Sequence, residues 1–455
     1  MSVIRDPDAE KLARMEFDEV DRTVEGSLWR PTKFYFAGLA ITVGLLLMFK
    51  GAWIDQVIRG IGLSSKTNPA GWTLYITTFV FWVGIAHSGT LISAILYLFR
   101  AKWRTSIYRA AEAMTVFAIM TAGLFPLIHL GRLWRMYYIL PIPNQRELWP
   151  NFTSPLMWDV VAVNTYLTVS TMFFYLGLIP DIASLRDRTH GLKHRIYALL
   201  ALNWVGSENQ WRYYKQAYMF FAALATPLVI SVHSVVSWDF AVSIIPGWHS
   251  TIFAPYFVAG AIHSGLAMVL TLLIPLRSRM KYKNLIRLVD LENVAKTLVF
   301  TGLIVGYSYI TEFFVAWYSG NGFEKSVFLY RAVGDYKAFF WTMFTCNAIV
   351  PLFFLSKRIR TSIPWLFVIS ILVNIGMWCE RFVIITTSLS HDFLPYSWGT
   401  IKMTPTDLMI VIGSFGLFLT LFLIFSKTLP PVATTEMKEA IELEREDLGL
   451  AGGAH

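Results

Sequence analysis

The chain has 455 residues, of which 55% are hydrophobic, 16% aromatic and only 15% charged. Soluble domains carry about a quarter of charged residues, so this composition excludes an ordinary soluble enzyme and indicates an integral membrane protein. The formal net charge of +9 comes from basic clusters between apolar runs, where Lys and Arg contact lipid headgroups and set the topology. We therefore expect lipid contacts and no nucleic-acid partner.

Ten apolar runs are long enough to cross a hydrocarbon core of about 30 Å, which takes about 20 helical residues. They cover residues 34–55, 72–99, 107–130, 156–180, 214–238, 252–276, 291–318, 335–356, 363–388 and 406–427. Long runs without alternation are typical of helices and not of barrel strands. The sequence thus predicts an all-α integral membrane protein: an N-terminal segment (1–33), a ten-helix membrane domain (34–427) and a C-terminal tail (428–455).

The basic residues predict which way the helices run. The N-terminal segment is charged and amphipathic and lacks the short apolar core of a signal peptide. Most Lys and Arg residues lie before the first helix and in alternate later loops, such as RAKWRTSIYR (100–109) and RSRMKYKNLIR (277–287). Because such residues accumulate on the cytoplasmic side, both termini are expected there, and the odd-numbered helices run outward. The acidic tail is expected to be a cytoplasmic helix, either solvated or in contact with other subunits.

No redox centre is marked in the sequence. Two cysteines, Cys346 and Cys379, lie in separate helices and form neither a disulfide framework nor a cysteine cluster for haem attachment or iron and sulfur. Four histidines lie singly on four helices: His87, His129, His233 and His263. Stacked haems of a cytochrome b usually take two histidines from each of two helices, so they are disfavoured, whereas a single haem between two helices stays open.

A repeat is visible within the membrane domain. GIAHSGTLISAILYLFR (84–100) and GAIHSGLAMVLTLLIPLR (260–277) share the pattern Gly-x-x-His-Ser-Gly at the same depth of the second and sixth helices. The next helix carries a carboxylate near its inner end in each case, at Glu112 and Glu292. A parallel repeat of four helices follows. It predicts two four-helix bundles, helices 2–5 (about 72–240) and helices 6–9 (about 252–390), with two peripheral helices.

His87 and His263, within the repeated pattern, have two interpretations. The neighbouring Ser and Gly let helices approach closely, and a histidine there can be a satisfied interhelical hydrogen-bonding group. Alternatively, because ionisable groups inside a membrane are costly and are rarely kept without a partner or a water path, the two histidines belong to a proton pathway with Glu112 and Glu292.

A second group of polar residues lies near the outer face. In FPLIHLGR (125–132), His129 ends the third apolar run. Ser154 and Pro155 are suited to the start of the fourth helix, which places Asp159 at the depth of His129. Asp239 lies at the outer end of the fifth helix. The sequence therefore predicts that an imidazole and carboxylates from neighbouring helices face one apolar pocket.

Such a pocket suits a small aromatic ligand. A His and an Asp can hydrogen-bond the oxygens of a quinol and accept its protons as general bases. Helix capping by a solvated His and Asp stays open as the alternative. The ninth helix adds Glu380 and Arg381 in its outer half, and Arg381 is either a member of the pocket or a snorkelling partner of Glu380. A secondary transporter is the competing class, although the densest polar cluster lies at the outer rim and not at the midplane.

Four stretches carry a resemblance to a known family: HSGTLISAILYLFRAKWRTSIYRAAEAMTVFA, FPLIHLGR, PIPNQRELWPNFTSPLMWDVVAV and ATPLVISVHSVVSWDFAVSIIPGWHSTIFAPYFVAGAIHSG. They resemble the NrfD/polysulfide reductase (PsrC-like) membrane-subunit family, and within it most the ActC subunit of alternative complex III, a bacterial quinol oxidising complex. The match runs through nearly all of helices 2–10. It implies a subunit with ten helices, two four-helix bundles and no haem, iron-sulfur cluster or other metal of its own, in the bacterial inner membrane.

The resemblance also implies a function. Menaquinol or ubiquinol is oxidised near the periplasmic side, with contacts on His129 and Asp159 and further members in Asp239 and Arg381. Electrons pass to a periplasmic iron-sulfur subunit and then to multihaem cytochrome c subunits and a terminal oxidase, next to a second NrfD-like membrane subunit. Proton translocation and the opposite direction of flow, quinone reduction by the membrane anchor of a polysulfide reductase-like molybdoenzyme, both stay open.

Overall fold

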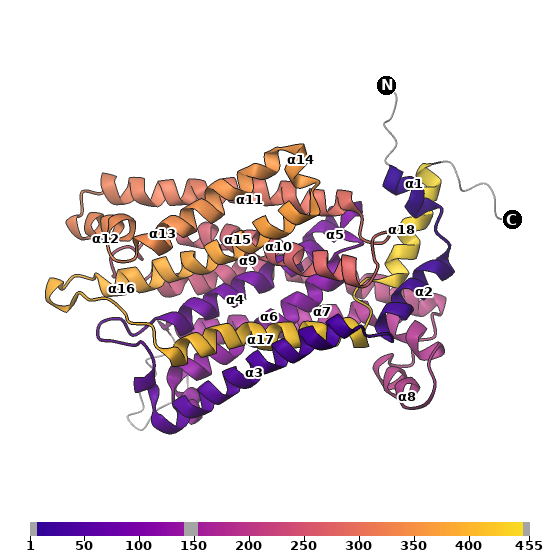
Figure 1. The fold of residues 1–455 in the computed structure, drawn as a ribbon, viewed down its shortest axis with the longest axis horizontal. Coiled ribbons are helices and arrows are strands. Elements are labelled where there is room, and N and C mark those ends of the chain that lie inside the picture. Colours follow the sequence, from indigo (N-terminus) through magenta and orange to yellow (C-terminus); the bar gives the residue numbers. More distant parts are fainter. Residues whose placement is uncertain (1–6, 141–152, 449–455) are drawn as a thin grey trace.

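The computed structural model describes residues 7–140 and 153–448, and its described part contains ten helices long and apolar enough to cross a membrane (Figure 1). They are α3 (Lys33–Arg59), α4 (Leu74–Thr90, continued to Leu98), α6 (Tyr108–Leu130), α7 (Pro155–Asp187), α9 (Glu208–Ala241), α10 (Phe253–Arg279), α11 (Leu288–Tyr318), α13 (Lys337–Phe344, continued to Leu355), α15 (Ile363–Phe382, continued to Ser390) and α17 (Pro405–Thr428). The prediction of an all-α protein with ten transmembrane helices is confirmed.

Two helices extend furthest beyond their predicted apolar runs. α7 continues seven residues beyond the predicted end at 180, and α9 begins six residues before the predicted start at 214. A capping box begins α9, because the Ser207 side chain accepts a hydrogen bond from the backbone N–H of Gln210. Hydropathy marks only the part of a helix that lies in hydrocarbon, so polar turns beyond it were missed.

The helices group into two bundles. α4, α6, α7 and α9 contact one another and are called bundle one below; α10, α11, α13 and α15 likewise form bundle two. α10 also contacts α4 and α9, which joins the bundles, and α3 packs along α17 outside both (Figure 1). This grouping follows the sequence repeat.

The repeated pattern lies where the two bundles meet. A Cβ atom added at Gly265 on α10 would lie only 1.9 Å from Ser88 Oγ on α4, and one added at Gly84 would lie 3.3 Å from Ser264 Oγ. Small residues therefore let the two helix backbones approach closely, as in other helix pairs within membranes. The Ser and Gly residues of the pattern accordingly serve in packing.

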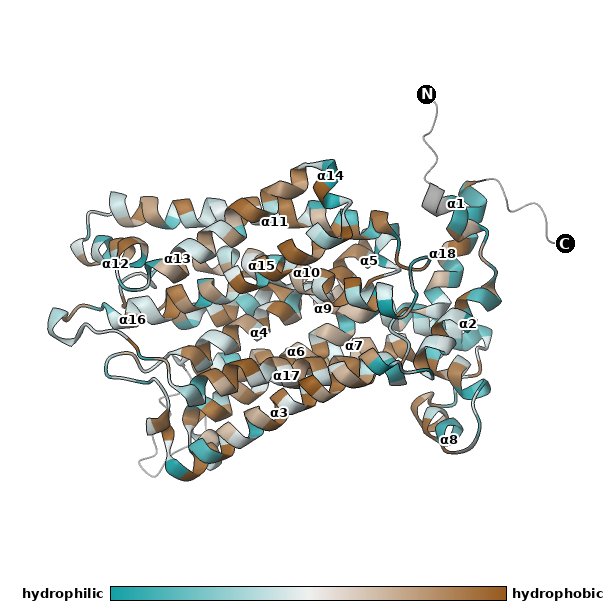
Figure 2. Ribbon diagram, viewed as in Figure 1, coloured by the Kyte–Doolittle hydropathy of each residue, from teal (hydrophilic) through white to brown (hydrophobic). Residues whose placement is uncertain are grey.

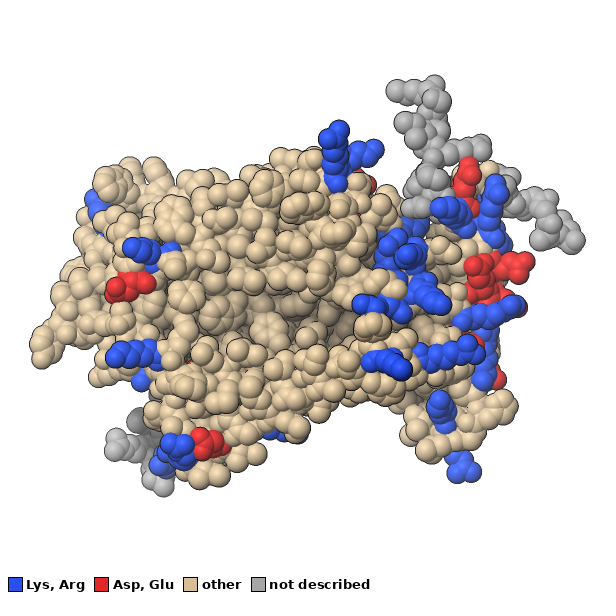
Figure 3. All heavy atoms as spheres, viewed as in Figure 1, with Lys and Arg blue, Asp and Glu red and all other residues tan. Residues whose placement is uncertain are grey.

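The first and last described helices, α1 (Pro7–Ala13) and α18 (Thr434–Asp447), lie at one end of the molecule, called the terminal end below, together with α2 (Phe17–Leu28) and α8 (Gly191–Leu200) (Figure 1). On the face that Figure 3 shows, Lys, Arg, Asp and Glu gather at this end and at the opposite end, and the surface between them is nearly free of charge. The helices that pass through this middle zone are largely hydrophobic (Figure 2). This distribution fits a protein that crosses a bilayer.

The C-terminal helix α18 is docked against the membrane domain. Met437 and Ile441 are buried. Asp181 of α7 accepts hydrogen bonds from Thr434 Oγ1 at 2.7 Å and from the backbone N–H of Thr435 at 3.1 Å. The tail helix is therefore not free in solvent, which was one of the two alternatives from the sequence.

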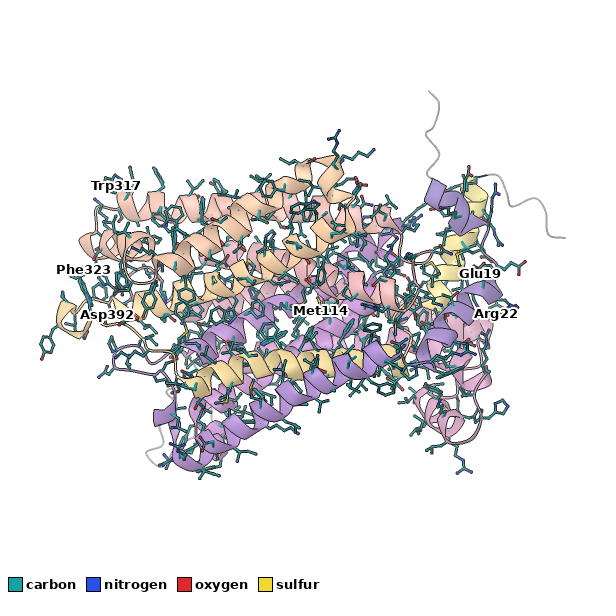
Figure 4. The ribbon with its side chains drawn as sticks, viewed as in Figure 1. Glu19, Arg22, Met114, Trp317, Phe323 and Asp392 are labelled. Carbon is teal, nitrogen blue, oxygen red and sulfur yellow. The ribbon has the colours of Figure 1, made fainter. Side chains whose placement is uncertain are left out.

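Side chains fill the spaces between the helices (Figure 4). Met114, labelled in the middle of the view, is fully buried on α6. By contrast, Glu19 and Arg22 of α2 project at the terminal end, and Trp317, at 70% exposed, lies at the opposite end. Cavities remain between some of the helices, and one of them lies in bundle one.

Candidate functional site

A cavity of about 480 Å³ lies in bundle one, in the half away from the termini. Its lining residues come from α4 and the loop before it, from α6, α7 and α9, and from the 3-10 helix η4 (Leu133–Ile139): Trp72, Ile76, Phe79, Ile119, Met120, Gly123, Pro126, His129, Leu130, Met136, Ile139, Leu156, Asp159, Val160, Val163, Asn164, Leu167 and Asp239. The volume lies within the range of about 300 to 1,000 Å³ that is usual for small-molecule sites. His129, Asp159 and Asp239, predicted to face one pocket, thus line one cavity.

His129 lies in the last turn of α6, which ends where Gly131 adopts a φ of +70°. This left-handed conformation favours glycine and turns the chain into η4. Helix α3 holds the end of α6 in place, since Gln56 Nε2 of α3 donates a hydrogen bond to the carbonyl oxygen of Ile128 at 2.9 Å. His129 Nδ1 is buried and has no hydrogen-bond partner among the described residues. It is therefore available to a ligand.

Asp159 and Asp239 form the carboxyl pair of the cavity. Ser154 is the N-cap residue of α7 and Pro155 its first residue, as predicted, although the Ser154 hydroxyl makes no capping hydrogen bond. Asp159 is 6% exposed, and its carboxyl group interacts with that of Asp239. One oxygen of each, Oδ1, lacks a hydrogen-bond partner within residues 7–140 and 153–448.

This arrangement has a direct chemical consequence. Two neighbouring carboxylates repel each other unless they share a proton, so the pair can take up a proton when a donor arrives. The imidazole provides a further acceptor or donor nitrogen. Most of the other lining side chains are aliphatic or aromatic. The cavity therefore suits a ligand with a hydroxylated ring at one end and apolar groups at the other.

Lys66 lies beside this site, in the loop before α4. Its Nζ donates a hydrogen bond to the carbonyl oxygen of His129. Burial lowers the pKa of Lys66 to about 8, and the nearby Asp407 carboxylate opposes this shift. Lys66 thus supports the backbone of the site and titrates closer to neutral pH than an exposed lysine does.

Arg381, predicted as a further member, lies elsewhere. It is not among the described residues that line the cavity. Its Nη1 is 3.1 Å from Glu380 Oε1, and its guanidinium lies over the Phe257 ring at 4.3 Å. Arg381 is 1% exposed, so it does not snorkel to the surface. The sequence left two interpretations of Arg381, a member of the pocket or a partner of Glu380, and its position agrees with the second.

The four residues of the predicted proton pathway lie in separate local networks. His87 donates from Nδ1 to the carbonyl oxygen of Val83 and stacks on Tyr166, with ring centroids 4.8 Å apart. Glu112 Oε1 accepts a hydrogen bond from Tyr218 OH at 3.3 Å, and its Oε2 is 3.7 Å from Arg109 Nη1.

In bundle two, His263 Nδ1 is 2.8 Å from Thr301 Oγ1. Glu292 is bound to Arg360 at 2.8 Å and to Lys296 at 3.3 Å, near the terminal end. Glu112 is buried whereas Glu292 is only half-buried, so the two carboxylates are not structural equivalents.

Sequence reasoning missed several buried polar residues. The His233 ring lies 4.6 Å from that of His87, and neither of its nitrogens has a partner in the described part of the chain. In bundle two, Tyr309 donates to Glu380, and Asn347 Nδ2 donates to Tyr309 OH at 2.9 Å. Asn347 lies on a π-helical turn (Thr345–Ile349), a feature often found at functional sites. The only sign of these residues in the sequence was that each is an isolated polar residue within an apolar run.

Within residues 7–140 and 153–448, no three His, Cys, Asp or Glu side chains gather where they could hold a metal ion. Cys346 and Cys379 are both buried free thiols.

Comparison with known proteins gives the family. The family model described as "Polysulphide reductase, NrfD" matches residues 62–391. A putative membrane subunit of dimethyl sulfoxide reductase from Halobacterium salinarum is 30% identical over 358 residues, which cover 77% of this chain and 76% of the relative. A subunit of selenate reductase from Mesobacillus selenatarsenatis is 22% identical over 367 residues, or 78% and 81%. This chain belongs to the NrfD family of polysulphide reductase membrane proteins.

Proposed function

We propose that this chain is the quinol-oxidising membrane subunit of a respiratory oxidoreductase. The observation that carries the proposal is the cavity in bundle one, in which His129, Asp159 and Asp239 lie at the end away from the termini and mostly apolar side chains line the rest. A quinol has the matching form, a dihydroxylated ring on an apolar chain. The relatives named above are subunits of reductases. A reductase needs electrons, and oxidation of a membrane quinol would supply them.

Oxidation of one quinol releases two protons and two electrons. In the proposal, one ring hydroxyl donates to the Asp159–Asp239 pair and the other to His129 Nδ1, whose bonding capacity is unmet among the described residues. Each acceptor makes loss of the electron from the ring easier by removing the proton as the electron leaves. The electrons then pass to an iron-sulfur cluster of a partner protein that covers the end of the molecule away from the termini.

Two types of complex are candidates for the assembly. In the alternative complex III type, electrons continue from the iron-sulfur subunit to multihaem cytochrome c subunits and a terminal oxidase, beside a second NrfD-like subunit. In the second type, this chain is the membrane anchor of a terminal reductase, which the relatives' names favour. Both place the site on the periplasmic side of a bacterial inner membrane with both termini in the cytoplasm.

The proton pathway is part of the proposal. The neighbouring rings of His87, Tyr166 and His233 lie within bundle one, and Glu112 lies farther toward the terminal end. We place these residues on a route for protons through bundle one, with His263 and Glu292 as its counterpart in bundle two. Vesicles with a trapped pH indicator would test this: a Glu112→Gln complex should oxidise quinol with a smaller pH change per electron than the unaltered complex.

The decisive experiment is Asp159→Asn in the assembled complex. Loss of a positioned general base slows proton transfer by about 10²- to 10⁴-fold, so quinol oxidation should fall by at least the lower factor while assembly persists. Asp392→Asn, at the same end but outside the cavity lining, is the matched control and should keep its activity. Unchanged turnover in Asp159→Asn would remove this carboxylate from the mechanism.

The direction of flow is tested on the same preparation. Added quinol should reduce the iron-sulfur partner before any terminal acceptor is supplied. If the chain purifies without redox partners, and vesicles that contain it take up a solute, the transporter interpretation is supported and the proposed function is wrong.

A further inference from the structure

The cavity in bundle one is elongated along the helices. On α6 its lining residues run from Leu130 back to Ile119, and on α7 from Leu156 forward to Leu167. At 1.5 Å per residue each stretch is about 16 Å long. Both lead from the polar end of the cavity toward the middle of the membrane-crossing helices. A small ring occupies only part of this length.

The deeper part of the cavity reaches the surface between α6 and α7. Met120 is 45% exposed, and Asn164 on the facing side of the opening is exposed as well. Both line the cavity, so they belong at once to its wall and to the outer surface of the bundle. Because this surface lies in the middle of two membrane-crossing helices, the opening faces lipid.

Gly123 lies at this opening, one turn from Met120 on α6. A Cβ atom added at Gly123 would meet no atom within 4 Å, so the space beside it is open and not filled by a neighbouring helix. This distinguishes it from Gly89 and Gly265, where an added Cβ would lie about 2 Å from other atoms (2.1 and 1.9 Å). Gly123 is therefore not explained by close helix packing.

The geometry points to a lateral portal between α6 and α7, formed by Met120, Gly123, Val163, Asn164 and Leu167, through which the isoprenoid tail of the quinol passes into the bilayer. The portal deepens the proposed function and rests on it. The absence of a side chain at Gly123 keeps the passage wide, and the polar end of the cavity positions the ring. The portal consequently distinguishes substrates by their tails, whereas the polar end of the cavity binds their rings.

The test compares two quinols with the same ring, one with a long isoprenoid tail and one with a short decyl tail. Gly123→Trp in the full complex fills the passage, and the open space beside Gly123 allows the side chain to fit without displacing a helix. Gly44→Trp is the matched control, because Gly44 lies on the membrane-crossing helix α3 and an added Cβ there also meets nothing within 4 Å. Long-tail quinone retained through purification provides a readout that is independent of turnover.

For Gly123→Trp we expect kcat/KM for the long-tail quinol to fall by about tenfold or more, equivalent to at least about 1.4 kcal/mol. The decyl quinol should lose less activity than the long-tail quinol, so the ratio of kcat/KM for the long-tail quinol to that for the decyl quinol should fall, and less long-tail quinone should be retained. Gly44→Trp should match the unaltered complex in all three measurements. Gly123→Ala should lie between the unaltered protein and Gly123→Trp.

Three results would overturn the reasoning at different points. If Gly123→Trp oxidises both quinols normally, the portal is wrong and the proposed function stands. If an assembled Gly123→Trp complex loses both activities equally, Gly123 belongs to the ring site and not to a tail passage. If the unaltered complex oxidises neither quinol, the proposed function itself fails, whatever the variants do.

Discussion

The carboxyl pair of the cavity allows a quantitative test of how protons leave the ligand. Asp159 and Asp239 come from α7 and α9, 80 residues apart in sequence, yet their carboxyl groups interact within one cavity. If the pair shares one proton, it acts as a single acceptor. Replacing either member by Asn then removes the same function, and replacing the second removes nothing more.

The expected magnitudes follow from this coupling. A single Asp159→Asn or Asp239→Asn change should lower kcat by about 10²-fold, at the lower bound for a general base, which corresponds to about 2.7 kcal/mol. Two independent acceptors would give a double variant that is slower by about 10⁴-fold. Groups that act as one unit are strongly non-additive, so we expect the double variant to stay near the single ones, at about 10²-fold.

The assay is steady-state quinol oxidation by the four complexes, with kcat and KM measured separately and assembly checked by the co-purification of partner subunits. The Asp392→Asn complex serves as the control. Because Asn keeps the shape of Asp, KM should change less than kcat. A double variant whose loss equals the product of the single losses would show two independent acceptors and refute the shared-proton argument.

Three further predictions concern stability and the terminal helix. Gly265→Ala should be less stable than Gly44→Ala by about 1 to 3 kcal/mol, the usual cost of overpacking, as measured by thermal unfolding in detergent; equal stability would contradict the close contact with α4. The pKa of Lys66 is lowered from 10.5 to about 8, so the unfolded chain binds more protons between these values. The unfolding free energy should therefore rise with pH from about 8 to 10.5 relative to Lys66→Gln, and parallel curves would refute the assignment. Asp181→Ala removes the acceptor at the start of α18, so limited proteolysis should cut residues 434–447 faster than in the unaltered protein; unchanged cleavage would show that α18 docks by other contacts.

The sequence predicted the membrane helices well because each depends mainly on its own composition. A run of apolar residues must be helical in lipid, whatever surrounds it. The repeat and the basic loops then restrict how the helices are grouped. The docking of α18 could not be predicted in this way, since it depends on Asp181, about 250 residues earlier, and on a face of only a few apolar residues such as Met437 and Ile441.

The candidate site was predictable in part for a related reason. His129 and Asp159 are unusual residues at the ends of consecutive apolar runs, so their depth follows from their position along each helix. Depth does not fix the direction in which a side chain points around the helix. Arg381 has a comparable depth but lies over Phe257 and against Glu380. Direction depends on how the helices are rotated against one another, and the sequence of a single chain does not supply that rotation.

The two bundles share a repeated pattern but differ at the end away from the termini. In bundle one, the cavity with His129 lies there. In bundle two, α12 (Gly322–Val333) lies across this end (Figure 1), and its buried Arg331 donates hydrogen bonds to the carbonyl oxygen of Gly247 at 2.9 Å and to Ser388 Oγ at 2.8 Å. These bonds tie α12 to the loop before α10 and to the continuation of α15. The two copies of the helical scaffold therefore differ at this end: bundle one holds a cavity of about 480 Å³, whereas in bundle two α12 covers the end and the cavity beside it measures about 210 Å³.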